Sequence, residues 1–373
     1  MKKRTKFLFS VLTALLFAVT LGGVFGAPVG IAAFAASTFI KAPAGSLRMA
    51  VTPEIWTDYI IGNLFKGNEF LLDSVDESQY VIGGTLVHIP QAGSVSGVKR
   101  NRETLPATIK RRKDIDITYP LDELTTDPRF IPNADTVELS YPKMESCMTE
   151  DMAALKQFAA ESMLYNWKPT YYIKASGTAS AANLVYGTGK RTSLTVADFA
   201  KAKSIFNKWN IDKADRFVIL STEMYEQLCA ELRESNDKNI GGIYDPVSGR
   251  LVKLEGFTIY ERSTTLMASN DALSSVSGIS GLFKWTGADL LYTPEEMVAI
   301  ESEDKVAATT ACVVGLFWSK TWVARAMGST QMFENTGDPT YYGDIYSFLQ
   351  RIGGRARRAD GKGVLGVIQA KAA

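Results

Sequence analysis

Residues 149–166, TEDMAALKQFAAESMLYN, form the most regular helical pattern in the sequence. Thr149 is a suitable N-cap, and the two acids after it suit the positive end of a helix dipole. Pro169 ends the pattern because proline does not continue a helix. Apolar side chains recur at helical spacing and form a single stripe, which predicts a long helix packed on a core: Met152, Leu155, Phe158, Ala159 and Met163.

A long hairpin is predicted before this helix. Residues 81–121 contain two alternating runs separated by a polar stretch with Gly and Pro, which predicts two strands and a long connection. The connection is basic, and Glu103 is the one acid among its cations. Two interpretations stay open: an arm that contacts an acidic neighbour or a phosphate backbone, and a loop kept soluble by its charge. Its cations are Lys99, Arg100, Arg102, Lys110, Arg111, Arg112 and Lys113.

After the helix, the predicted strands and helices do not alternate as regular βαβ units, which predicts an α+β architecture. Thr195 and Asp198 have capping-box spacing and predict the start of a second helix. A buried strand at residues 217–220 precedes a third helix, and a strand pair follows within GRLVKLEGFTIYERS. An apolar hairpin is predicted for TACVVGLFWSKTWVARAM, residues 310–327, and a final strand for residues 364–368.

Composition excludes several function classes. The net charge of the 373 residues is +1, so only local patches can attract nucleic acid or anionic lipid. The single histidine, His88, rules out paired-histidine zinc motifs within one chain and is expected at a strand edge. The three cysteines, Cys147, Cys229 and Cys312, have no CxxC spacing, which predicts small buried residues in a reducing compartment. We expect no catalytic residue, no cofactor and no metal site.

One phosphate-loop candidate fails on its spacing. GTGKRT, residues 187–192, has Leu184 where the first glycine is needed, and Arg191 where Ser or Thr must follow Lys190. A second basic cluster lies beside a Gly-rich bend near the C-terminus, and its members are Arg351, Arg355, Arg357, Arg358 and Lys362.

The first 48 residues differ in character from the rest. Lys2, Lys3, Arg4 and Lys6 precede an uncharged stretch that runs to Ile40, and AFAAS supplies small residues for a signal peptidase. The pattern predicts a membrane-directed leader, with membrane contact through residues 1–40 alone. Because Met49 also suits initiation, three origins stay open: a processed leader, an added anchor, or a misassigned start.

The order of these elements resembles that of the major capsid proteins of tailed bacteriophages, which have the Hong Kong 97-type fold. MAVTPEIWTDYIIGNLFKGNEFL is similar to the start of such a subunit. DRFVILSTEMYEQL and GRLVKLEGFTIYERS resemble the strand, helix and hairpin of its A domain. DPTYYGDIYSFLQRIGGRARRADGKGVLGVIQA resembles its C-terminus, so the resemblance runs from about Arg48 to the end.

The resemblance implies a division of the chain. Residues 1–48 are the leader, 49–75 an N-terminal arm, and 76–125 an extended hairpin, the E-loop. Residues 126–190 are the P domain with its spine helix, 191–310 the A domain, and 311–373 a C-terminal hairpin and strand that return to the P domain.

The resemblance also implies a non-enzymatic shell subunit. Such a subunit assembles with itself into hexamers and pentamers around double-stranded DNA, with scaffold, protease, portal and decoration proteins as further partners. The E-loop tip then contacts an adjacent subunit, and the C-terminal basic cluster contacts a subunit or the packaged DNA. The virion is the expected location, with assembly in the host cytoplasm, and the apolar leader departs from the family pattern.

Two other functions are weighed against this one. Taken at face value, the leader indicates an exported or membrane-tethered surface or binding protein. A hydrolase that uses His88 is the weakest alternative, because no nucleophile elbow accompanies it.

Overall fold

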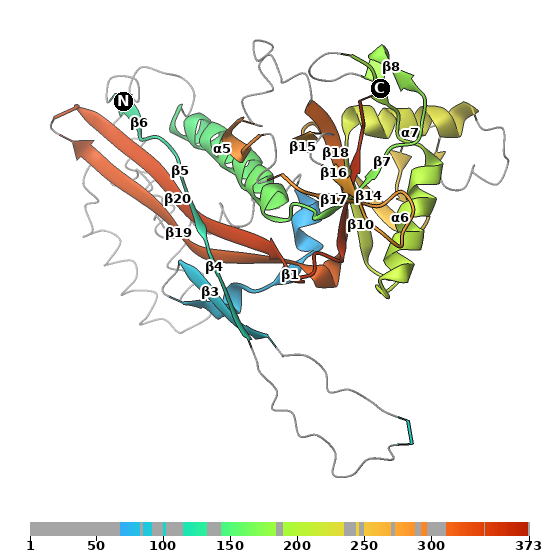
Figure 1. Cartoon of the computed structure of the whole chain (residues 1–373). Coiled ribbons are helices and arrows are strands. Elements are labelled where there is room, and N and C mark those ends of the chain that lie inside the picture. The colour runs from blue at the N-terminus through green and yellow to red at the C-terminus, as the bar shows by residue number, and fades with distance from the viewer. Residues whose placement is uncertain are drawn as a thin grey trace, which may run out of the picture. The chain divides into compact units, whose positions relative to one another are not determined.

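One long α-helix lies between two β-sheets in the part of the chain that the structure describes (Figure 1). The structure is a computed structural model. It describes residues 68–82, 85–91, 100–101, 115–132, 143–183, 189–234, 244–245, 250–269, 273–287, 292–296, 311–338 and 340–371, all of which belong to one compact unit. The predicted leader and most of the predicted N-terminal arm lie outside these residues.

Helix α5 spans Lys143–Asn166 and confirms the predicted stripe. Met152, Leu155, Ala159 and Met163 are buried, and Phe158 packs partly against the same core. The predicted start was wrong, because the helix begins six residues before Thr149. Buried Met148 extends the stripe by a turn, and this packing outweighs the local resemblance of Thr149 to a cap.

A five-stranded sheet covers one side of α5. Its longest strands form an antiparallel hairpin, β19 with β20, and β1 joins β19 in parallel. Alternate residues of β20 face the helix, and Tyr346, Phe348 and Ile352 share a buried cluster with it. The strands are β1 (Val75–Asp76), β19 (Val323–Asp338), β20 (Gly343–Ala356), β5 (Asp122–Thr125) and β6 (Arg129–Pro132).

A nine-stranded sheet forms the second layer. Helices α6 (Val196–Lys208) and α7 (Thr222–Glu234) pack on one face, while the other face shares the core of α5. Burial on both faces explains why strand β18 reads as an unbroken apolar run. In order, the strands are β13 (Lys253–Leu254), β14 (Phe257–Arg262), β10 (Arg216–Ser221), β18 (Ala311–Ser319), β21 (Val364–Ile368), β7 (Tyr171–Lys174), β17 (Phe283–Trp285) and β16 (Leu273–Ser275), with β15 (Leu266–Ser269) also on β18.

Strand pairing corrects one prediction about the C-terminal region. The apolar hairpin predicted at residues 310–327 does not form, because β18 and β19 belong to different sheets and are joined by the 3-10 helix η6 (Lys320–Trp322). Strands β18 and β21 pair with each other, and β18 pairs with β10. Both therefore lie in the sheet that contains the predicted A-domain strands. An apolar run shows that a strand is buried, but it does not show which sheet receives it.

The predicted hairpin is confirmed where the structure describes it. Strands β3 (Leu86–Gln91) and β4 (Ile115–Pro120) are antiparallel, with β2 (Val81–Ile82) on the edge. His88, expected at a strand edge, lies instead on β3, the central strand of this small sheet, with its Nδ1 3.0 Å from Asp116 Oδ2 of β4. The remaining short elements are η1 (Glu69–Leu72), η2 (Ser78–Tyr80), η3 (Ala181–Asn183), the pair β8 (Ala179–Ser180) and β9 (Arg191–Thr192), and the pair β11 (Tyr244–Asp245) and β12 (Arg250–Leu251).

Smaller predictions also have clear outcomes. The capping box at α6 is present, since the Thr195 N–H donates to the Asp198 carboxylate at 3.1 Å. Arg191, which breaks the phosphate-loop pattern, is buried and donates through Nη2 to the Ala311 carbonyl at 2.7 Å. Cys229 and Cys312 are buried and form no disulfide with each other, while the side chain of Cys147 lies outside the described set. No helix within the described ranges has the length and apolar character to span a membrane.

A buried ion pair joins α5 to the nine-stranded sheet. Glu161 Oε1 of α5 lies 2.8 Å from Arg262 Nη2 of β14, with side chains 0% and 11% exposed. Thr264 donates a further hydrogen bond to the same carboxylate. Removal of one partner from a buried pair leaves a charge with no counterion in a low-dielectric environment.

We predict that Arg262→Met lowers the free energy of unfolding by about 3–5 kcal/mol. Arg233→Met is the matched control, since its pair with Glu226 has side chains 52% and 59% exposed, and we expect it to cost less than about 1 kcal/mol. Urea denaturation of the unassembled subunit measures both. Equal losses would show that the buried pair does not stabilise this junction.

Candidate functional site

The root of the β3–β4 hairpin is held by one buried carboxylate, Glu77, which is 1% exposed. Tyr119 of β4 donates its hydroxyl to Glu77 Oε2 at 3.0 Å. Arg357 donates from Nε to Oε1 at 3.0 Å, and Arg355 Nε lies 3.5 Å from Oε2. These contacts connect a residue before the hairpin, a residue within it, and two residues at the end of β20.

Electrostatics and packing both fix this root. Burial, and then the negative charge of Glu77, raise the pKa of Tyr119 well above its usual value, so the phenol stays protonated and can donate. The Arg355 guanidinium lies 5.3 Å from the centre of the Tyr119 ring. Val87 and Leu121 also pack in a small buried cluster with Ala326 of β19. The hairpin therefore leaves the body from a fixed base.

The C-terminal basic residues do not form one patch, because each lies beside an acid of its own chain. Arg351 donates to Glu123 Oε2 from Nε at 2.9 Å and from Nη2 at 2.8 Å. Arg358 Nη2 and Lys362 Nζ lie 2.6 and 3.5 Å from Asp360 Oδ2, while Arg355 and Arg357 share Glu77. This pairing reduces the excess charge available to a phosphate backbone. The pairing with Asp360 could be predicted from the sequence, because Asp360 lies within RRADGK, next to the cations that it pairs with. The pairing with Glu77 could not, because Glu77 lies far away in sequence.

The predicted basic hairpin tip lies mostly outside the described residues. Arg100 is described and is exposed. Lys99, Arg102, Lys110, Arg111, Arg112 and Lys113 fall outside the described set.

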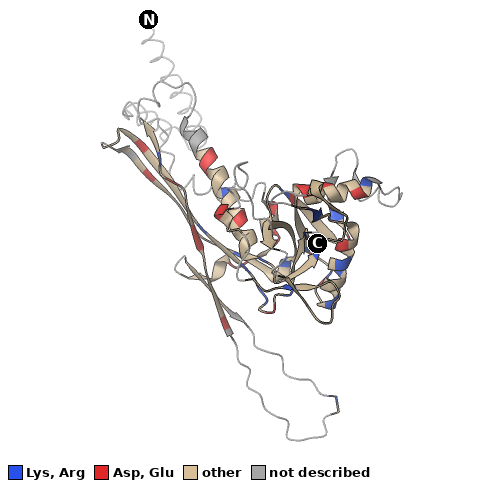
Figure 2. Ribbon diagram, turned by 45° about the horizontal axis from the view of Figure 1, so that its top comes forward, with Lys and Arg blue, Asp and Glu red and all other residues tan. Residues whose placement is uncertain are grey.

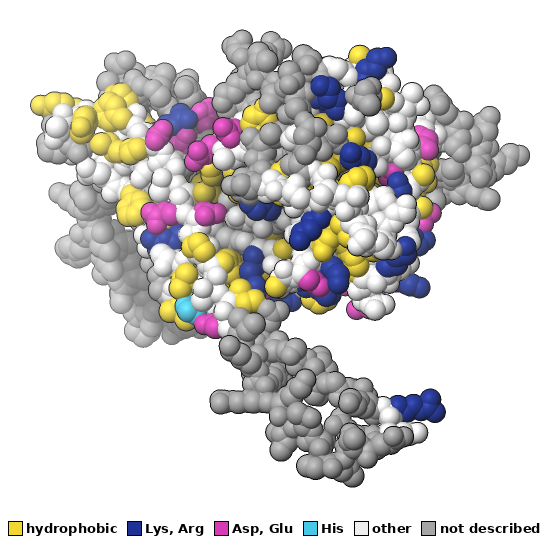
Figure 3. Space-filling model, viewed as in Figure 1, with side chains coloured by type: hydrophobic (Ala, Val, Ile, Leu, Met, Phe, Trp, Pro, Cys, Tyr) yellow, Lys and Arg dark blue, Asp and Glu magenta, His cyan; other side chains and the backbone are white. Residues whose placement is uncertain are grey.

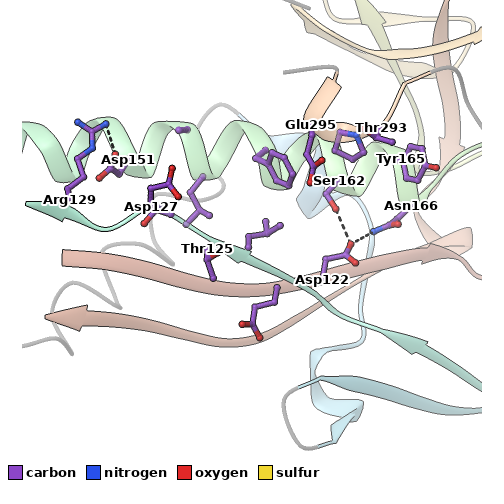
Figure 4. A pocket seen from close by; sticks show the side chains of 17 residues that line it. Asp122, Thr125, Asp127, Arg129, Asp151, Ser162, Tyr165, Asn166, Thr293 and Glu295 are labelled. Atoms are coloured by element: carbon purple, nitrogen blue, oxygen red, sulfur yellow. Dashed lines mark hydrogen bonds and ion pairs between the residues drawn. The ribbon is translucent and has the colours of Figure 1, made fainter. Parts of the chain in front are cut away.

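An acidic groove of about 940 Å³ lies between α5 and strands β5 and β6 (Figure 4). Arg129 is the one cation among the described residues that line it. Figure 2 shows acidic positions along α5, on the helix that forms one wall. Sequence reasoning missed this groove because its acids come from three separate segments. The five carboxylates are Asp122, Glu123, Asp127, Asp151 and Glu295.

The groove acids differ in their surroundings. Asp122 accepts hydrogen bonds from Ser162 Oγ at 3.1 Å and Asn166 Nδ2 at 3.2 Å. Arg129 Nη2 lies 2.8 Å from Asp151 Oδ1, yet burial raises the pKa of Asp151 because desolvation outweighs the favourable charge. Asp127 and Glu295 are exposed. The groove therefore offers both positioned and exposed acceptors to a cationic partner.

We predict that Glu77→Gln lowers the free energy of unfolding by about 3 kcal/mol, since two guanidinium groups lose their shared counterion. Glu123→Gln is the control, because its carboxylate is 48% exposed and its loss is expected to cost less than about 1 kcal/mol. Hydrogen exchange of the β3 and β4 amides, measured with the denaturation midpoint, checks both. Unchanged exchange in Glu77→Gln would contradict the role given to this carboxylate.

Comparisons with known proteins give a match in structure alone. No family model matches the sequence, and no curated protein matches it. The capsid structure of Cyanophage P-SCSP1u is similar with a TM-score of 0.55 at 15% identity, over 80% of this chain and 87% of that chain. The mature capsid of bacteriophage PhiM1 gives 0.51 at 11% identity, over 79% and 84% of the two chains. The acid-stable capsid of Helicobacter pylori bacteriophage KHP30 gives 0.51 at 12% identity, over 80% and 88%.

These likenesses each cover about four fifths of this chain. Because the sequence identities are 15% or lower, these likenesses show the fold alone. The chain has the α+β, Hong Kong 97-type fold of phage capsid proteins, as the order of its sequence elements predicted.

Proposed function

We propose that this protein is a major capsid protein whose copies assemble into the icosahedral head of a tailed bacteriophage around double-stranded DNA. The observation that carries the proposal is the shared fold, which extends over about four fifths of the chain in three phage capsids. A structural, non-catalytic role fits this fold. The partners are other copies in hexamers and pentamers, and the location is the virion.

The E-loop supports this proposal through its geometry and charge. Its root is fixed on the body by Glu77, while seven cations of its tip have one acid among them. The acidic groove beside α5 has five carboxylates of opposite sign; Glu123 and Asp151 pair with arginines of the same chain, while Asp127 and Glu295 are exposed. We infer that the tip of one copy contacts the groove of an adjacent copy. Complementary charge favours this pairing and fixes its register.

Other expected roles remain part of the same proposal. Arg351, Arg355, Arg357, Arg358 and Lys362 contact a neighbouring subunit or packaged DNA without sequence preference, beyond the ion pairs that they make within the chain. Scaffold, protease, portal and decoration proteins join the assembly. The division into arm, E-loop, P domain and A domain follows the proposed family. No feature of the described residues favours the exported or membrane-tethered alternative, which rests on residues 1–40.

Assembly is the direct test. We predict that the full chain, and the chain begun at Met49, form large closed particles when expressed in the bacterial cytoplasm. Sedimentation velocity and electron microscopy of the purified proteins measure this. If both chains stay monomeric at high concentration and the full chain is exported, the exported-protein alternative replaces the capsid proposal.

A further inference from the structure

One arginine of the same chain already occupies part of the acidic groove. Arg129 is the one cation among the described residues that line the groove, and it lies on strand β6, which forms one wall. Its Nη2 lies 2.8 Å from Asp151 Oδ1, and its Nη1 lies 3.5 Å from Glu150 Oε2. Figure 4 shows the guanidinium group on the Asp151 carboxylate, with Asp127 nearby. The groove therefore holds the same chemical group that Arg100 carries on the E-loop.

Arg129 is held less firmly than the other arginine that pairs with a groove acid in the described part of the chain. Its side chain is 46% exposed, and its two ion pairs are with adjacent acids of α5. Arg351, by contrast, is 25% exposed, donates twice to Glu123, and donates from Nη1 to Ser329 Oγ at 3.2 Å. Because exposed ion pairs contribute little free energy, an incoming cation can displace Arg129 at a small cost.

The carboxylate that Arg129 contacts can accept a further cation. Burial raises the pKa of Asp151, the charge of Arg129 lowers it in part, and the charge of Glu150 raises it again. The ionised form of Asp151 is therefore still less stable than in water, so another positive charge stabilises it. Figure 3 shows acidic side chains gathered between α5 and the five-stranded sheet, whereas basic side chains lie mainly over the nine-stranded sheet. A basic partner is thus attracted to the part of the surface where Arg129 lies.

We propose that Arg129 competes with the basic E-loop tip of an adjacent copy for Asp151, and is displaced when that tip binds. The inference rests on the proposed function, which supplies the adjacent copy. In the free subunit Arg129 neutralises part of the groove, so it weakens the contact between copies. Each copy has one tip and one groove, so every subunit of a shell carries this effect once. The competition therefore raises the subunit concentration at which assembly begins.

Arg129→Gln tests this competition in the full chain, because glutamine stays polar but carries no charge. Unassembled subunits are concentrated stepwise, and sedimentation velocity gives the lowest concentration at which particles form. We expect Arg129→Gln to lower this concentration about three- to fivefold, the effect of one exposed ion pair per subunit. Arg129→Lys keeps the charge and is expected to stay within about twofold of the unmodified chain. Arg233→Gln is the control without change, since its exposed pair with Glu226 lies outside the groove.

The direction of the change separates competition from a structural role. If the ion pair only fastened β6 to α5, Arg129→Gln would raise the concentration needed for assembly or leave it unchanged. Either result overturns the inference and leaves the capsid proposal intact, as does a failure of Arg129→Gln to fold, which tryptophan fluorescence detects.

A second variant tests whether Asp151 is the carboxylate for which the two cations compete. Asp151→Asn removes this acid, so Arg129→Gln added to that background is expected to give no further gain in assembly. A gain as large as in the unmodified background would show that Arg129 acts through another group, and it would overturn the inference. Failure of the unmodified chain to form particles overturns the proposed function and the competition together.

Discussion

The buried charge of Glu77 is the constraint on which the placement of the hairpin depends. A carboxylate that is 1% exposed persists only with close counterions and hydrogen-bond donors. Here these come from Tyr119 within the hairpin and from Arg355 and Arg357 at the end of β20. Satisfying one charge therefore brings three distant segments together. The pairing with Glu77 also explains why these two arginines do not contribute to a shared basic surface.

The same body holds its surface features in fixed positions. Helix α5 shares one buried cluster with both sheets, and the Glu161–Arg262 pair ties it to β14. Such packing leaves the layers little freedom to move relative to one another. Close-packed interiors do not deform continuously, so they change only between discrete packing arrangements. The groove and the root of the β3–β4 hairpin are thus presented by one framework. A subunit that must close a shell needs contacts held at fixed angles, since small angular errors prevent closure of a ring.

Local patterns in the sequence predicted the parts of the fold that depend on local physics. The stripe of α5, the β3–β4 hairpin and the capping box at Thr195 follow from periodicity and from short-range hydrogen bonds. The start of α5 and the sheet that receives β18 depend on tertiary packing, which periodicity does not record. The groove was missed for the same reason, as Asp122, Asp151 and Glu295 meet through the fold. The sequence also did not show that the C-terminal cations are paired with Glu77, Glu123 and Asp360.

The central claim is that copies hold one another through a basic hairpin tip and an acidic groove. Zero-length carbodiimide cross-linking tests it most directly, because it joins only lysines and carboxylates in contact. Particles are assembled from an equal mixture of ordinary and ¹⁵N-labelled subunits and analysed by mass spectrometry. The account predicts mixed-isotope cross-links from Lys99, Lys110 or Lys113 to Asp127 or Glu295. Cross-links from these lysines that are isotopically pure, or that reach only carboxylates outside the groove, would contradict it.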